Sequence, residues 1–282
     1  MGIVNVTPDS FAEITRLETR DAIELALLME AQGADLLDIG GESTRPGADP
    51  VPAPEELSRI LPVFEGLAGR VRVPLSVDTR KASVARAALR AGAVMVNDTS
   101  GGDPDDAVAK VVADSGAALI IMHARGDSKD MYAEAVYRDV LEEVEVELRV
   151  RIERARSVGV PLESLVVDPG IGFAKRASQS YGVLGRLPEL TEAIDRPVLV
   201  GPSRKSYLRE ALGDIPAAAR DWGTAAAVTA AVLAGAHILR VHAVPEMVQV
   251  TRVAEAIRQA GQSDARSTQG PDRGIRSVSD GQ

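Results

Sequence analysis

The sequence predicts a single α/β domain folded as a (β/α)8 TIM barrel, and three observations lead to that prediction. Eight short apolar runs alternate with segments of helical period along most of the chain. Such alternation is typical of βαβ units and a parallel sheet. Each run ends on, or leads directly to, a polar residue of a kind that binds ligands. Eight such units in about 250 residues match the size and count of a closed barrel.

The eight apolar runs are the predicted strands, and their polar ends predict a pocket. In a closed barrel the carboxyl ends of all strands meet at one mouth, where active sites lie. The runs and the polar residues that follow them are Ile3–Val4 with Asn5, Leu36–Leu37 with Asp38, Leu75–Val77 with Asp78, Val94–Val96 with Asn97, Leu119–Ile121 with Met122 and His123, Leu165–Val167 with Asp168, Val198–Val200 with Ser203 and Lys205, and Ile238–Leu239 with Arg240 and His242.

Segments of helical character lie between these runs. Leu57, Ile60, Leu61 and Phe64 follow the spacing i, i+3, i+4, i+7, which forms one apolar face of a helix. The segment that starts at Pro104 opens with a proline and acids, which suit a helix N-terminus. The predicted helices cover residues 18–32, 57–67, 80–91, 104–114, 140–152, 176–190, 203–212, 218–235 and 245–260.

An open, doubly wound sheet is the structural alternative. No G-x-G-x-x-G follows the first strand, and polar strand ends recur all the way along the chain. Both observations favour the barrel. Residues 1–260 form the predicted barrel domain. Residues 261–282 lack apolar periodicity and are rich in Ser, Asp, Arg, Gln and Gly, so we expect a disordered tail there.

Composition limits the classes of function. The net charge of -9 argues against a general binder of nucleic acid or anionic membranes, so any anion site needs a local basic cluster. The absence of cysteine excludes disulfides and Cys-ligated metals. No run approaches the roughly 20 apolar residues of a membrane helix, and the N-terminus does not resemble a secretory signal. We therefore expect a cytoplasmic protein.

Acids and amides at the strand ends suggest recognition of a planar heterocycle. Asp78, Asn97 and Asp168 end the third, fourth and sixth runs, and carboxylates are natural partners for adjacent N–H donors. The alternative is that each caps the following helix. Two glycines follow Asp168 in the string 168–173, where they permit close approach of the backbone to a ligand.

Basic residues at other strand ends supply a candidate anion site. The glycine-containing loop 40–47 carries Arg45, and Lys205 lies between a predicted strand and a predicted helix start. Arg240 and His242 follow the last strand. For a lone Lys-Arg pair, a solvated helix start would be the better interpretation. We expect Mg²⁺ to be held by Asn5 and ligand phosphates, because Mg²⁺ is often bound by few protein groups. His123 and His237 are interpreted as structural.

Taken together, the strings closely resemble the dihydropteroate synthase family, in order and in register with the eight units over residues 2–260. No single string would be decisive, but the ordered set is highly specific. The strings are Asn5–Phe11, Asp38–Gly47, Val77–Thr79, Asn97–Asp98, Met122–His123, Asp168–Phe173, Ser203–Lys205 and Arg240–His242.

The resemblance implies a transferase of folate biosynthesis. It would join 4-aminobenzoate to (7,8-dihydropterin-6-yl)methyl diphosphate and release diphosphate, with Mg²⁺ as cofactor. The implied catalytic residues are Asp168, Lys205, Arg240 and His242. The residues that the resemblance implies for the pterin are Asp78, Asn97, Met122, Asp168, Lys205 and Arg240. Those implied for the diphosphate are Asn5, Arg45, Arg240 and His242, and Asn5 would also bind the metal. Those implied for 4-aminobenzoate are Thr44, Pro46, Phe173 and Ser206, and Asp38 would help to order that site.

The sequence departs from the family in three places. Residues 12–15, Ala-Glu-Ile-Thr, replace the usual Ser-Asp-Gly-Gly of a loop that covers aminobenzoate. Pro202 is less usual before the Ser-Arg-Lys string, and Ala243 stands where Asp is common. The first departure leads to the hypothesis that sensitivity to sulfonamides, which mimic 4-aminobenzoate, is altered.

Three other functions are alternatives. A pterin-binding paralogue without synthase activity would keep the pocket, but the retained basic residues argue against it. A folate-dependent methyltransferase barrel needs no diphosphate site, so loop 43–47 and string 203–205 argue against it. A generic phosphate-binding barrel isomerase is less favoured. The family resemblance also suggests a homodimer formed through the late helices, since 218–235 is rich in Ala.

Overall fold

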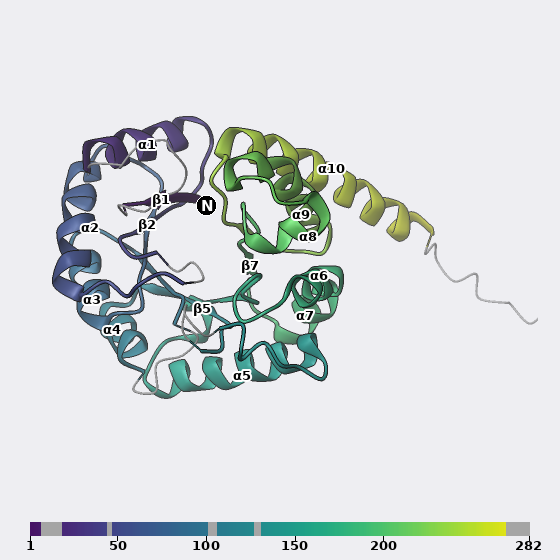
Figure 1. Cartoon of the computed structure of the whole chain (residues 1–282), viewed down its shortest axis with the longest axis horizontal. Helices are drawn as coiled ribbons and strands as arrows, with labels where there is room; N and C mark the ends of the chain where they lie inside the picture. The colour runs from purple at the N-terminus through teal and green to yellow at the C-terminus, as the bar shows by residue number, and fades with distance from the viewer. Residues whose placement is uncertain (7–18, 44–46, 101–105, 127–130, 269–282) are drawn as a thin grey trace, which may run out of the picture.

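The chain forms a closed ring of strands surrounded by helices (Figure 1). The structure, a computed structural model, describes residues 1–6, 19–43, 47–100, 106–126 and 131–268. The strands are β1 Gly2–Asn5, β2 Leu37–Gly40, β3 Leu75–Asp78, β4 Met95–Asp98, β5 Ala118–Met122, β6 Leu165–Asp168, β7 Leu199–Val200 and β8 Ile238–Leu239.

Helices follow the strands in the alternating order that the sequence predicts. The α-helices are α1 Thr19–Ala31, α2 Ala53–Leu67, α3 Ala82–Arg90, α4 Ala107–Ser115, α5 Val140–Ser157, α6 Ala177–Gly185, α7 Leu187–Ile194, α8 Arg209–Leu212, α9 Asp221–Leu233 and α10 Val244–Thr268. Short 3₁₀ turns span Leu162–Ser164, Ser206–Leu208 and Ala217–Arg220.

Parallel pairing closes the barrel. Strands β1 to β6 pair in sequence order, and β7 pairs with β8. Two isolated parallel bridges join these sheets, Val167 with Val198 between β6 and β7, and Gly2 with Val241 between β8 and β1. The amide of Ile3 donates to Val241 O at 3.0 Å across the second seam. All eight strand ends therefore open on one mouth, as in a TIM barrel.

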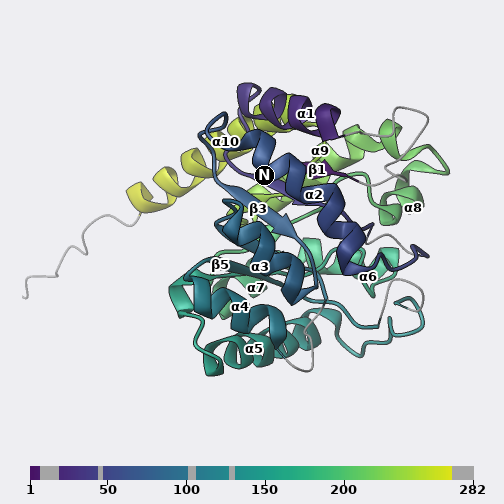
Figure 2. The ribbon, with the colours of Figure 1, turned by 90° about the vertical axis from the view of Figure 1, so that its left-hand side faces the viewer.

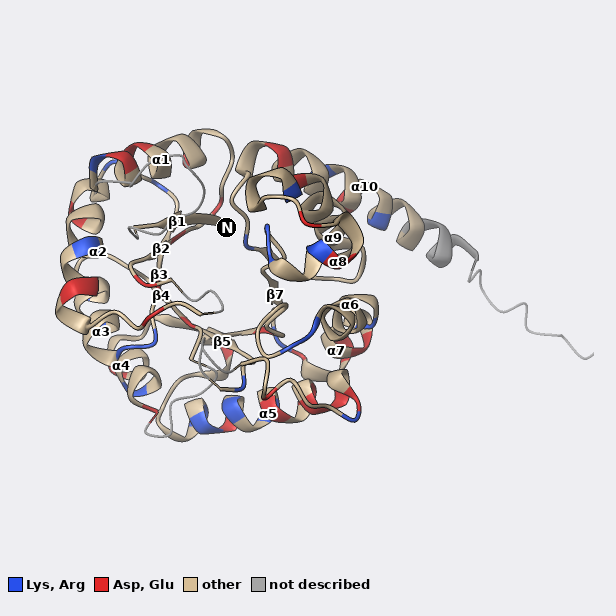
Figure 3. Ribbon diagram, in the orientation of Figure 1, with Lys and Arg blue, Asp and Glu red and all other residues tan. Residues whose placement is uncertain are grey.

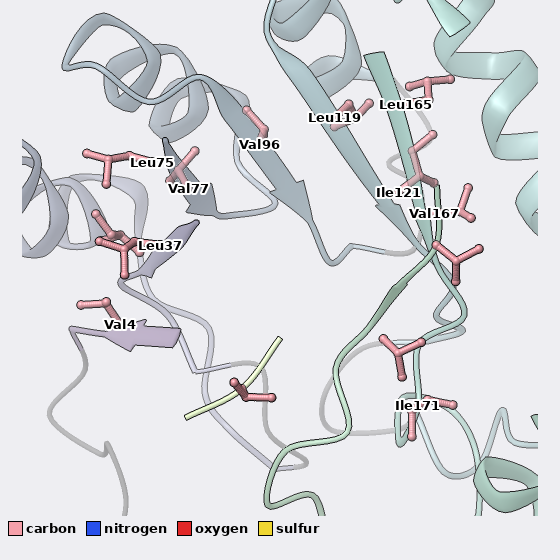
Figure 4. Packing of buried hydrophobic residues seen from close by; sticks show 14 of the residues in the cluster. Val4, Leu37, Leu75, Val77, Val96, Leu119, Ile121, Leu165, Val167 and Ile171 are labelled. Carbon is pink, nitrogen blue, oxygen red and sulfur yellow. The ribbon is translucent and has the colours of Figure 1, made fainter. Parts of the chain in front are cut away.

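Side chains divide between the inside of the barrel and the helix layer. Ile120, Val166 and Leu199 form an inner apolar cluster on β5, β6 and β7. Neighbouring residues such as Leu119 and Val167 join the larger core beneath the helices, because successive strand side chains alternate in direction. Figure 4 shows part of this larger core along the consecutive strands. Aliphatic side chains dominate it, as the low aromatic content requires.

The bounds of the predicted helices differ from the structure in several places, and three of these differences have a clear structural form. Residues 176–190 form two helices, α6 and α7, because Pro188 stands in the first turn of a new helix rather than inside a long one. Residues 203–212 begin as a tight turn in which Arg204 has φ 57°, so the helical part starts only at Ser206. Helix α10 continues to Thr268, past the expected barrel limit at 260.

The outer surface carries mixed charge. Lys, Arg, Asp and Glu lie side by side along the helices, most densely on α5 (Figure 3). Figure 2 shows the ring from the side, with the end of α10 projecting away from it. In the ranges that the structure describes, no helix is long and apolar enough to cross a membrane.

Candidate active site

Arg240 connects three strand ends at the barrel mouth. It follows β8, and its Nε donates to Asp38 Oδ2 of β2 at 2.6 Å while its Nη2 donates to Asp78 Oδ2 of β3 at 2.7 Å. Asp38 is fully buried and Asp78 nearly so. The guanidinium therefore holds two carboxylates in fixed positions at the base of the site.

Asn97 adds an amide to this group. At the end of β4, its Nδ2 donates to Asp38 Oδ2 at 2.9 Å. Within the described residues, Asp38 Oδ1 and Asn97 Oδ1 are buried and have no hydrogen-bond partner. A buried acceptor without a partner costs about 1–3 kcal/mol, so the site gains most from a ligand that brings N–H donors.

Burial sets the protonation of this cluster. Desolvation raises the pKa of Asp78 to about 7, although Arg240 acts in the opposite direction. Burial also lowers the pKa of Arg240, but the two carboxylates outweigh it and leave the pKa above its usual value. With a pKa of about 7, Asp78 is partly protonated at neutral pH, and the oxygens of the two carboxyl groups suit a ligand edge that donates protons or hydrogen bonds.

Asp168 lies at the end of β6, beside a turn that only glycine can make without strain. Its Oδ1 accepts the Gly170 N–H at 2.7 Å, and desolvation raises its pKa against the opposing effect of Lys205. Gly170 has φ 67°, and a Cβ there would lie 1.9 Å from His123 O. The glycine thus permits the close packing that holds the Asp168 carboxylate.

Lys205 closes the site from the loop after β7. Its Nζ donates to Ile171 O at 2.6 Å and lies 4.4 Å from the centre of the Phe173 ring. Burial lowers the pKa of Lys205 to about 8, despite the nearby Asp168. Lys205 is therefore a cation that can lose its proton near pH 8, and it lies between the β6 loop and Arg240.

His242 is oriented by a serine from the neighbouring loop. Ser203 Oγ lies 2.9 Å from His242 Nδ1 and also accepts the His242 backbone N–H at 3.2 Å. The turn that carries Ser203 is held by Arg204, whose Nε and Nη2 each contact Asp221 at 2.7 Å. The Ser-Arg-Lys string thus contains one orienting residue, one structural ion pair and one cation for the site.

The remaining predicted residues lie near this cluster or outside the described ranges. Asn5 is half-buried at the end of β1, in register with Gly40. Met122 is buried in register with Asp168. Ser206 is exposed, with its Oγ 3.1 Å from Tyr132 OH. Thr44, Arg45 and Pro46, and residues 12–15, lie outside the residues that the structure describes.

Sequence reasoning missed two features of the site. Asp38 was expected to order the aminobenzoate side, whereas its side chain joins Arg240 and Asn97 at the centre. Lys175 is almost fully buried behind Asp168, with its Nζ 2.8 Å from His123 Nδ1. Only its place two residues after Phe173 could have drawn attention to it.

Comparisons with known proteins identify the family of the chain. Residues 1–242 match the family model described as pterin binding enzyme. The chain is 44% identical to the dihydropteroate synthase of Synechocystis, over 91% of this chain and 89% of that protein. It is 45% identical to the folic acid synthesis protein fol1 of Schizosaccharomyces pombe, over 92% of this chain but only 36% of that longer protein.

Solved structures give the same result at the level of the fold. The dihydropteroate synthase of Yersinia pestis in a sulfonamide complex superposes with a TM-score of 0.87 at 40% identity, covering 92% of this chain and 93% of that one. The Xanthomonas albilineans enzyme with 4-aminobenzoic acid has a TM-score of 0.83 at 42% identity, covering 93% and 92%. The chain therefore belongs to the pterin-binding enzyme family, among its dihydropteroate synthases.

Proposed function

We infer that this protein is a dihydropteroate synthase. It would condense (7,8-dihydropterin-6-yl)methyl diphosphate with 4-aminobenzoate, giving 7,8-dihydropteroate and diphosphate. The observation that carries the proposal is one cluster, in which acceptors with buried, unpartnered oxygens lie beside Arg240 and Lys205 at a single barrel mouth. A pterin edge needs such acceptors, and a diphosphate needs such cations.

Asp38, Asp78, Asn97 and Asp168 are the acceptors proposed for the pterin. Met122 would pack against the ring. The Asp168 carboxylate and the carboxyl oxygens of Asp38 and Asp78 favour positive charge on the pterin. These residues would therefore stabilise the carbon from which diphosphate departs.

Cations at the same mouth are proposed to receive the leaving group. Arg240, Lys205 and His242 would stabilise the negative charge that develops when the methylene carbon–oxygen bond breaks. The amine of 4-aminobenzoate then forms the new carbon–nitrogen bond and loses one proton to diphosphate or water. Because the amine attacks an electron-poor carbon, the site needs no strong general base.

Asn5 is the proposed protein ligand of Mg²⁺. The described residues contain no group of three or more His, Asp or Glu side chains that could hold a metal ion. The amide oxygen of Asn5 is a hard donor at the mouth, and Mg²⁺ commonly takes few protein ligands beside phosphate oxygens and water. When bound, the ion would neutralise charge on the diphosphate. Asn5, with Arg45, would orient that group.

Phe173 and Ser206 are the described residues proposed for 4-aminobenzoate. Phe173 lies against Lys205, and the Ser206 hydroxyl contacts Tyr132 at the rim of the mouth. Thr44 and Pro46 complete the proposed set. The sequence departure at residues 12–15 is the basis of the hypothesis that sulfonamide sensitivity is altered. Parallel measurements of the inhibition constant of a sulfonamide and of KM for 4-aminobenzoate would test it.

A homodimer is proposed through the late helices. Large apolar side chains are exposed on α8, α9 and α10, namely Leu212, Trp222, Leu233, Val253 and Ile257. The Trp222 side chain is the most exposed of these, at 88%. A second copy of the chain would remove this surface from water, which is the main source of free energy in such contacts.

A coupled diphosphate-release assay tests the proposed function. We expect release only when pterin diphosphate and 4-aminobenzoate are both present. Binding of the pterin substrate without release would instead identify a pterin-binding protein that lacks synthase activity.

A further inference from the structure

Lys175 is a buried lysine for which the proposed reaction has no use. It follows the β6 loop directly and precedes α6, and only 1% of its surface is exposed. Its Nζ lies 2.8 Å from His123 Nδ1, 3.2 Å from Gly170 O and 3.1 Å from Phe173 O. Burial of a lysine is costly, so a role is expected for it.

The loop that Lys175 contacts has an unusual backbone. Gly170, Gly172 and Ala174 have φ of 67°, 79° and 46°, so every second residue is left-handed. At Ala174 this conformation costs on the order of 1–3 kcal/mol, which the surroundings must offset. The loop carbonyls are satisfied by Lys175, at residues 170 and 173, and by Lys205, at residue 171. Tyr137 OH donates to the carbonyl of Ala174 at 2.9 Å.

Burial lowers the pKa of Lys175 well below its usual range, against the opposing effect of Asp168, but the contacts of its Nζ favour the ammonium form. Burial, with Lys175 nearby, lowers the pKa of His123 to about 3, so its ring is neutral. His123 Nε2 lies 3.1 Å from Glu147 Oε2, and although the pair is not aligned as a hydrogen bond, a proton on Nε2 faces this carboxylate favourably and leaves Nδ1 as an acceptor. Three acceptors thus surround Nζ, and only the charged form has three N–H donors.

The loop bears directly on the substrate site. The Gly170 N–H holds Asp168 Oδ1, and Phe173 supplies the ring beside Lys205. We propose that Lys175 is a positioning residue whose buried ammonium, seated on His123, braces the Gly170 and Phe173 carbonyls and thereby orients Asp168 and Phe173 for the reaction. The reaction in question is the one proposed above, so this assignment rests on that function.

Kinetics of Lys175→Met test the positioning role, because methionine keeps the length and removes all three donors. We expect kcat to fall by about a hundredfold, since small misplacement of reacting groups has effects of that order. KM for 4-aminobenzoate should rise more than KM for the pterin substrate, because Asp78 and Asn97 lie outside the loop. Lys110→Met, on the exposed side of α4, is the matched control. Unchanged kinetics, or equal rises in both KM values, would overturn the proposal.

Two readouts do not depend on activity. Amide hydrogen exchange at residues 170–175 should accelerate at least about tenfold in Lys175→Met and remain unchanged in Lys110→Met. If the wild-type chain lacked synthase activity but exchange still accelerated in Lys175→Met, the proposed function would be wrong while the positioning of the loop by Lys175 would stand. Unaltered exchange would refute the brace.

The wild-type protein supplies the second readout. Lysine-selective NMR should detect a slowly exchanging ammonium that disappears in Lys175→Arg, and this measurement stands even if Lys175→Met does not fold. A neutral amine signal from Lys175 would contradict the proposal.

Discussion

At the scale of single residues, the site combines hydrogen-bond acceptors that lack a partner with a guanidinium that two carboxylates share. Asp38 and Asp78 both form ion pairs with the guanidinium of Arg240, while Asp38 Oδ1 and Asn97 Oδ1 have no hydrogen-bond partner among the described residues. The unpartnered oxygens predict where a ligand donates hydrogen bonds. The shared guanidinium of Arg240 predicts where negative charge is received.

Asp168→Asn should reduce turnover more than substrate binding. Asparagine retains an oxygen that can accept the Gly170 N–H, but it removes the charge that favours a cationic pterin carbon. We expect kcat to fall by about 10²–10³-fold and KM for the pterin substrate to change by less than about threefold. Steady-state kinetics with both substrates measure this. A wild-type kcat would show that Asp168 does not stabilise the transition state.

Lys205 predicts the pH dependence of pterin diphosphate binding. Burial lowers its pKa to about 8, so the cation is lost as pH rises through that value. KM for pterin diphosphate should therefore rise between about pH 7 and pH 9. Lys205→Arg stays charged over this range, so its KM should be nearly independent of pH even if kcat is lower. The same rise in both proteins would assign the titration to another group.

Residue types at the strand ends were predictable, but their pairings were not. Asp78, Asn97, Asp168 and Arg240 could be named because apolar runs end on them, and β pairing brings those ends together. Lys175 gave no such signal, because a lysine before a helix is normally solvated. It is buried against a loop with positive φ angles, whose carbonyls at residues 170 and 173 accept its hydrogen bonds, and local composition does not encode that arrangement.

At the scale of elements, the backbone of the β6–α6 loop is tightly constrained. Gly170→Ala would put a Cβ 1.9 Å from His123 O at φ 67°. We expect the free energy of unfolding to fall by about 2–4 kcal/mol and activity to fall with it. Urea denaturation monitored by circular dichroism measures the first effect.

Gly185→Ala is the control for that substitution. It lies at the end of α6, and a Cβ there would meet no atom within 4 Å. Its stability should stay within about 1 kcal/mol of wild type. Equal losses in the two variants would mean that crowding at Gly170 does not determine the loop.

Helix periodicity predicted the existence of most helices and missed several boundaries. The expected helix 176–190 is divided, because Pro188 lies in the first turn of a second helix. The expected helix 203–212 begins later than predicted, because Arg204 has a positive φ. The length of α10 also exceeded the expectation. Continuous apolar spacing cannot reveal such local breaks.

At the scale of the whole molecule, strand alternation predicted a barrel, and two single bridges close it. Val167 pairs with Val198 and Gly2 with Val241, so the two shortest strands complete the ring. The closed ring brings Asn5 of β1 near the residues that follow β8. An open sheet would have separated them by its full width.

Trp222→Glu should reduce the solution mass from a dimer to a monomer. The side chain is 88% exposed on α9, and a charge there would oppose burial against a second copy. Light scattering measures the mass. Val146→Glu places the same charge on exposed α5 and should leave the dimer intact. A wild-type monomer, or a dimer that survives Trp222→Glu, would count against this interface.

The most direct test of the account is the stoichiometry of products formed by the full chain. Incubation with (7,8-dihydropterin-6-yl)methyl diphosphate and 4-aminobenzoate should yield one 7,8-dihydropteroate per diphosphate, as measured by chromatography with mass detection and a phosphate assay. Omission of either substrate should abolish both products. Diphosphate released without dihydropteroate, or neither product despite tight binding of the pterin substrate, would contradict the proposed synthase.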